Sequence, residues 1–252
     1  MADPLAVAAL ALWCFLVALI GGLLGLVLGN IRLPLVVALA AGPAAGAGAN
    51  LGISGVAAAT ASISHIRAGR VDWRMFRWMA PPSVVGALVG SYFSGLLPDA
   101  ALLAVIGAAL LYFGIDLLRP GKAPQPRPDA GLDVRAAVWS GALIGLLGGT
   151  IGLILGTLRM PALIRSVGLT PERAIGTNLT VGICVGAAGL IGHTPEGIDW
   201  DIFAVGALAS IPGALIGARL TGRLSKEQLL RAIGVVLVLS GGVMLGNAAV
   251  SA

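Results

Sequence analysis

The sequence has little charge and almost no cysteine. Charged residues make up 11% of its 252 residues, whereas soluble domains carry about 25%. The mean hydropathy is +0.98. These values exclude an ordinary soluble domain, because such a chain would have too little polar surface. The two cysteines, Cys14 and Cys184, both lie inside apolar runs. They therefore imply neither a disulfide framework nor a metal site.

Recognisable catalytic motifs are also missing. The sequence contains no phosphate-binding loop, no zinc-ligand spacing and no nucleophile motif, and its apolar runs hold no carboxylate pair. We therefore predict a protein that is not an enzyme and needs no cofactor and no metal. The net charge of +5 comes mostly from basic residues between apolar runs. Membrane topology explains this placement better than a nucleic-acid partner does.

Long apolar runs dominate what remains. Each is long enough, or nearly so, to cross a bilayer as a helix of roughly 20 residues, and together they predict an all-α polytopic membrane protein. The eight runs cover residues 5–31, 35–63, 79–97, 101–115, 136–158, 174–192, 202–218 and 232–250.

A fourteen-residue motif occurs twice. GGLLGLVLGNIRLP (21–34) and GGTIGLILGTLRMP (148–161) are identical at eight positions, including Arg32/Arg159 and Pro34/Pro161. The offset of 127–128 residues also aligns Asn50 with Asn178, and His65 with His193. The chain therefore divides into two repeats, 1–118 and 135–252, joined by a proline-rich and charged linker at 119–134.

Equivalent loops of the two repeats carry different charge. The loop 66–77 holds four arginines, whereas its counterpart, 193–201, holds no lysine or arginine. The next loop reverses this pattern, because 219–231 is basic and 95–100 is not. Basic loops stay in the cytoplasm, so 66–77, 119–135 and 219–231 are expected inside and both termini outside. The two repeats are therefore predicted to be inverted relative to each other.

An inverted repeat must contain an odd number of crossings, but hydropathy offers four runs per half. We expect the missing element where a helix breaks, at 29–34 and 156–161, with Pro34 and Pro161 as helix breakers. The pieces around each break form either two short spans or a hairpin that enters part-way. About ten membrane segments result, in the usual plan of transporters with broken helices.

The repeated arginines lie deep in apolar segments, where a charge is costly and usually functional. None of the eleven acidic residues lies within ten residues of Arg32 or Arg159. An anionic ligand would supply the missing partner, since guanidinium matches two oxygens of a carboxylate, sulfonate or sulfite. Two alternatives remain open: the arginines ligate carbonyls of the broken helices, or they snorkel to the headgroups.

Other residues of the motifs are candidates for the same site. Gly29 and Gly156 would give the backbone freedom next to the break. Asn50 and Asn178 are expected to start the following helix, either as caps or as amide donors to an anion. His65 and His193 are expected near the membrane surface, with proton coupling as the alternative role. The remaining polar candidates for substrate contact are Asn30, Thr157 and Thr177.

Glycines recur at a spacing of four residues, as in Gly86/Gly90 and Gly213/Gly217. This spacing lets helix backbones approach closely. It favours packing within the chain, and it would serve a homodimer equally well.

The repeated glycine-rich motif that leads to a proline resembles the TauE/SafE family of anion exporters, also called the toluene sulfonate uptake permease group. SIPGALIGARL (210–220) and GLTPERAIGTNL (168–179) resemble that family too. The resemblance implies transport of sulfite, sulfoacetate or related organic anions across a bacterial inner membrane.

The sequence therefore predicts a secondary transporter of small anions. Two inverted bundles would alternate around a midplane site lined by the arginines, with the anion and the bilayer as partners. A passive anion channel with an arginine selectivity ring is the alternative.

Overall fold

A computed structural model describes residues 3–93, 98–119, 133–151, 153–193 and 197–250. Throughout these residues the regular structure is helical. The elements are α1 (Pro4–Leu24), α2 (Gly29–Leu39), α3 (Pro43–Arg67), α4 (Trp73–Tyr92), α5 (Asp99–Leu118), α6 (Val134–Thr150), α7 (Gly156–Pro161), η1 (Ala162–Val167), α8 (Pro171–His193), α9 (Trp200–Leu220), η3 (Thr221–Arg223) and α10 (Lys226–Val250). The predicted linker falls largely at 120–132, outside the described residues.

Several helices have the length and composition of membrane spans. Five segments qualify among the described residues: Pro4–Leu24, Ala100–Leu118, Pro171–Ile191, Trp200–Arg223 and Lys226–Val250. The shorter helices α2 and α6 are also apolar. The expectation of an all-helical, multi-pass membrane protein is therefore confirmed.

Three of the few acidic residues lie at helix starts, where they cap the helices. Asp133 accepts a hydrogen bond from the Ala136 amide at 2.9 Å, and Asp199 accepts one from the Ile202 amide at 3.0 Å. Asp3 caps α1 in a similar way. A carboxylate at this position satisfies an amide that the helix leaves unpaired.

The first apolar run is interrupted, although earlier than expected. Gly25 ends α1 in the left-handed conformation (φ 68°), which glycine adopts without strain. Residues 25–28, the first break, are not helical. Gly29 begins α2 and Pro34 lies inside it. The break therefore depends on Gly25 rather than on Pro34, and the arginine motif is helical.

The second run is interrupted at the equivalent place. The chain leaves α6 at Thr150, and α7 begins at Gly156. The segment between them, 151–155, is the second break, of which residue 152 is not described. Pro161 ends α7, and the helix continues as the π-helical turn η1. Pro161 therefore changes the type of helix and does not interrupt it.

Helix pairs of the two halves match each other. α1 packs along α9, α6 packs along α4, and α5 packs along α10. At the first contact, Cβ atoms on Gly213 and Gly217 would strike the Phe15 and Leu19 carbonyls. At the second, Cβ atoms on Gly86 and Gly90 would strike α6 carbonyls. The predicted packing role of these glycines is confirmed.

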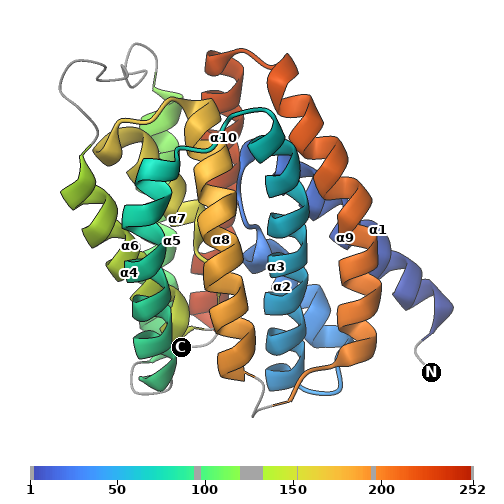
Figure 1. The fold of residues 1–252 in the computed structure, drawn as a ribbon. Coiled ribbons are helices and arrows are strands. Elements are labelled where there is room, and N and C mark those ends of the chain that lie inside the picture. The colour runs from blue at the N-terminus through green and yellow to red at the C-terminus, as the bar shows by residue number, and fades with distance from the viewer. Residues whose placement is uncertain (1–2, 94–97, 120–132, 152, 194–196, 251–252) are drawn as a thin grey trace.

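The helices α3 and α8 lie side by side in the middle of the view in Figure 1, flanked by α9 and α4. Each packs on the short helix of its own half, α3 on α2 and α8 on α7. Asn50 and Asn178 lie well inside these two helices, which begin at Pro43 and Pro171. The expectation that the asparagines start their helices was wrong, because proline at the first turn starts each helix earlier.

We predict that Gly217→Ala lowers the free energy of unfolding by about 1–3 kcal/mol, the usual result of overpacking. The new Cβ would meet the Leu19 carbonyl oxygen and would lie 2.8 Å from the Leu23 nitrogen. The measurement is the thermal unfolding midpoint in detergent. Gly242→Ala on α10 is the matched control, because nothing lies within 4 Å of its new Cβ. Equal midpoints for the two variants would contradict the prediction.

Candidate functional site

The first arginine of the repeated motif lies inside the protein. Arg32 of α2 is 2% exposed. Its Nε donates to the Asn50 side-chain oxygen at 2.9 Å, and its Nη2 donates to the Asn50 backbone oxygen at 3.0 Å and to the Ser54 hydroxyl. All three acceptors belong to α3, so the guanidinium fastens α2 to α3.

The second arginine has fewer partners. Arg159 of α7 is fully buried, and its Nη1 donates to the Asn178 side-chain oxygen at 3.2 Å. Its Nε and Nη2 have no hydrogen-bond partner among the described residues. Such orphaned donors are costly at a buried site.

The two asparagines also hold the backbone at the breaks. The Asn50 amide donates to the Gly29 oxygen at 3.2 Å. The Asn178 amide donates to the Gly156 oxygen at 2.8 Å and to the Gly25 oxygen at 2.7 Å. Gly25 belongs to the first half, so Asn178 ties both breaks together. The asparagines thus perform the carbonyl ligation that was considered for the arginines.

Neither arginine is paired with an acid in the described part of the chain. The ion pairs there are Arg165–Asp116 at 2.9 Å and Arg173–Asp72 at 3.3 Å. Both arginines are buried within the protein, whereas snorkelling would leave the charged group at the headgroups. Two positive charges are therefore held inside the protein without a carboxylate.

A small cavity borders Arg32. It is lined by α1, the first break, Arg32, Ser54 and Leu179. Its volume is about 20 Å³, which is room for about one water molecule. The space beside Arg32 is therefore smaller than a sulfite or sulfonate ion.

The other predicted contacts are divided between the site and its surroundings. A Cβ on Gly29 would lie 2.9 Å from the Ser54 oxygen, and one on Gly156 would lie 3.1 Å from the Val27 nitrogen. Asn30 and Thr157, which follow these glycines in the sequence, are buried. The Thr177 hydroxyl instead accepts a hydrogen bond from the Asp72 amide at 2.9 Å. Thr177 therefore fixes the start of α4.

His65 lies in the last turn of α3, which ends at Arg67. His65 is fully buried, and its Nε2 donates to the Gly22 oxygen at 3.1 Å. The glycine-rich helix α1 packs close enough to α3 for His65 to reach that carbonyl. The position of His65 along α3 could not reveal this contact. The side chain of His193 lies outside the described residues. No group of three metal-ligating side chains occurs among the residues searched, which are the described ones.

Ser54 is a site residue that sequence reasoning missed. It lies four residues after Asn50, on the same face of α3. This spacing was visible in the sequence. Its partner was not, because only the fold brings α2 onto this face of α3.

We predict that Asn178→Leu lowers the free energy of unfolding by about 1–3 kcal/mol, because it leaves buried polar groups unpaired. Two glycine carbonyls and Arg159 lose a partner. The unfolding midpoint in detergent measures the effect. Asn247→Leu makes the same replacement at a half-buried position of α10. If both variants unfold at the same temperature, Asn178 does not hold the breaks.

Comparison with known proteins gives a consistent result. The profile of the family described as Sulfite exporter TauE/SafE matches residues 10–244. No solved structure gives a significant match to the chain.

Curated relatives cover most of the chain. A protein named probable membrane transporter protein from Xylella fastidiosa (strain 9a5c) is 30% identical over 186 residues, covering 70% of each chain. Probable membrane transporter protein YtnM from Bacillus subtilis is 26% identical over 239 residues, covering 91% of this chain and 77% of YtnM. Because the family profile spans nearly the whole sequence, the chain belongs to the TauE/SafE family of membrane transporters.

Proposed function

We propose that this protein is a secondary transporter of small oxyanions, with Arg32 and Arg159 at its substrate site. The observation that carries the proposal is the burial of two guanidinium groups without a carboxylate partner among the described residues. A buried charge without compensation is strongly destabilising. A bound anion supplies that compensation, and it does so reversibly, as transport requires.

Sulfite, sulfoacetate and related organic anions are the proposed substrates. The family description names sulfite export. The chemistry of the site agrees, because sulfite, sulfonates and carboxylates all present two oxygens that a planar guanidinium can bind together. A buried cation also favours a ligand with negative charge over a neutral one.

The two halves are proposed to be inverted repeats. Their contacts support this. The helix α1 of the first half packs on α9, and the equivalent helix α6 of the second half packs on α4, the equivalent of α9. In Figure 1, both chain ends are marked toward the lower end of the bundle, while η3 and the start of α10 lie at the upper end. This arrangement agrees with five crossings of each half when each short helix and its break count as one crossing.

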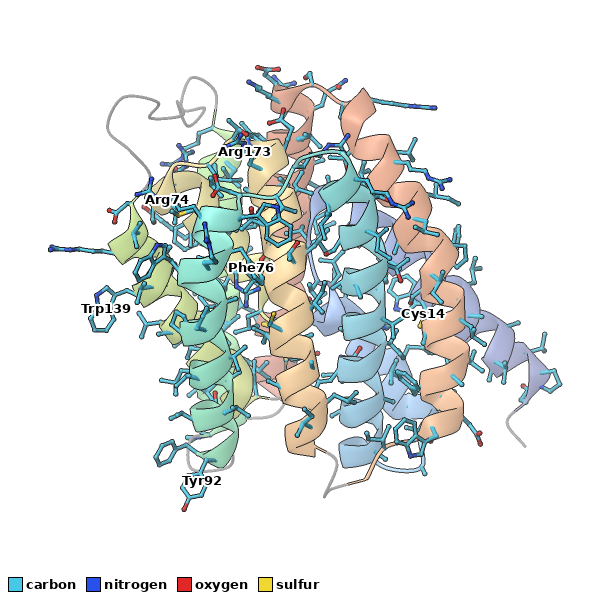
Figure 2. All side chains as sticks on the ribbon, viewed as in Figure 1. Cys14, Arg74, Phe76, Tyr92, Trp139 and Arg173 are labelled. Atoms are coloured by element: carbon cyan, nitrogen blue, oxygen red, sulfur yellow. The ribbon has the colours of Figure 1, made fainter. Side chains whose placement is uncertain are left out.

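The distribution of basic residues supports an orientation in the membrane. Arg74 and Arg173 both lie toward the upper end of the molecule in Figure 2, and Tyr92 lies at the opposite end. Because basic ends face the cytoplasm, we place the upper end inside and both termini outside. The curated relatives come from bacteria, and the inner membrane is the proposed location.

Alternating access suits the site better than a channel does. The space beside Arg32 holds about one water, so an anion passes only if the surrounding helices move. In transporters with broken helices at the interface between repeats, one repeat or bundle rocks against the other around the fixed site.

We predict that sulfite, sulfoacetate or a small carboxylate raises the unfolding temperature of the wild type but not of Arg32→Ala or Arg159→Ala. A ligand that binds the folded state stabilises it by mass action. Arg67→Ala is the control, since it removes an exposed charge and should respond as the wild type does. Equal responses of all variants would mean that the buried arginines are structural.

The same anion should then be tested for transport in liposomes. We expect saturable uptake that is accelerated by unlabelled anion on the other side, as in exchange. Uptake that rises in proportion to concentration, without acceleration, would favour the passive channel.

We further predict that the double variant His65→Gln, His193→Gln keeps its anion exchange rate at neutral pH within about twofold of the wild type. Glutamine preserves a donor toward the Gly22 oxygen. Proton coupling by histidine would require its titration. Loss of exchange by correctly folded protein would assign the histidines a role in transport.

A further inference from the structure

The two arginines occupy equivalent positions in sequence but differ in which edge of the guanidinium is paired. The side formed by Nε and Nη2 can bind two oxygens of one anion at the same time. In Arg32, this edge is filled by Asn50 and Ser54. In Arg159, it has no partner among the described residues, because Asn178 binds Nη1 instead.

One position accounts for much of this difference. Ser54 follows Asn50 by four residues on α3, and its hydroxyl accepts from Arg32. The residue that follows Asn178 by four on α8 is Gly182. Residues four apart share a helix face, so Gly182 offers no oxygen where Ser54 offers one. The nearest atoms to a Cβ on Gly182 would be the Val27 Cγ2 at 3.2 Å and the Ala58 Cβ at 3.7 Å.

We propose that the transported anion binds side-on to Nε and Nη2 of Arg159, and that Arg32 is a positioning residue. This inference rests on the proposed function and assigns unequal roles to the two halves of its site. Arg32 contributes positive charge to the site, but its binding edge is committed to α3. Arg159 keeps two donors that only a further acceptor can satisfy.

The proposal also connects binding with movement. Arg159 is fully buried, so an anion reaches its open edge only when elements packed around it move. The bound anion then satisfies the orphaned donors, which lowers the cost of closing the site around it. The anion-bound transporter would therefore close more readily than the empty one.

The test is to supply the missing hydroxyl. Gly182→Ser offers Arg159 the oxygen that Ser54 gives Arg32, and it should compete with the anion. Gly182→Ala adds the same Cβ without the oxygen and is the matched control. We expect the Kd for sulfite or sulfoacetate, measured by titration calorimetry in detergent, to be at least about tenfold higher for Gly182→Ser than for Gly182→Ala.

Two further variants keep the proposal testable if position 182 tolerates no side chain. Arg159→Lys should raise the Kd at least about tenfold, because lysine cannot bind two oxygens with a planar fork. Ser54→Ala should raise the Kd less than Arg159→Lys does, because Arg32 retains Asn50 as a partner.

The outcomes separate the two proposals. Equal Kd values for Gly182→Ser and Gly182→Ala, or a larger loss in Ser54→Ala than in Arg159→Lys, would overturn the assignment to Arg159 while leaving anion transport intact. If the wild type binds neither sulfite nor sulfoacetate, then the proposed function fails in its stated substrate class, and this inference fails with it.

Discussion

The structure depends on satisfying polar groups where no water is available. Each half interrupts a helix inside an apolar bundle, and an interrupted helix leaves carbonyl oxygens without partners. The Asn178 amide answers this need at the end of α1, where it binds the Gly25 oxygen of the first break, and it also binds the Gly156 oxygen at the start of α7. Asn50 performs the same task for Gly29. Without these amides, the glycine oxygens at the breaks would lose a hydrogen-bond donor inside the protein.

The central place of α3 and α8 follows from that constraint. Each asparagine must reach a break, so α3 and α8 must lie against the short helices α2 and α7. Small residues make this approach feasible. A side chain at position 29 would collide with Ser54, so glycine is needed there. Gly156 lies against the backbone of Val27. The glycine faces of α4 and α9 bring the outer helices equally close to their partners. Close packing thus serves the polar network as much as it serves the apolar core.

The repeat supplies two copies of one arrangement, and the differences between the copies are the basis for a function. Arg32 is held by three acceptors on α3, whereas Arg159 is held by one on α8. Arg32, whose Nε and Nη2 are both paired with α3, fastens two helices together. Arg159, which has donors to spare, is where we propose that the anion binds. A buried cation without an acid nearby is stabilised by a bound anion, and the proposed function rests on this property.

The sequence by itself determined the fold class, the two copies of the arginine motif and the existence of a break in each first run, since composition, apolar run length and glycine act locally. It placed the breaks a few residues late, because Pro34 can be accommodated within a short helix while Gly25 ends the one before it. Only the tertiary structure decided which polar atoms meet. His65 is paired with Gly22 across 43 residues, and Thr177 with Asp72 across 105. Such pairs depend on how helices pack against one another, and the spacing of residues along one helix carries no information about its neighbour.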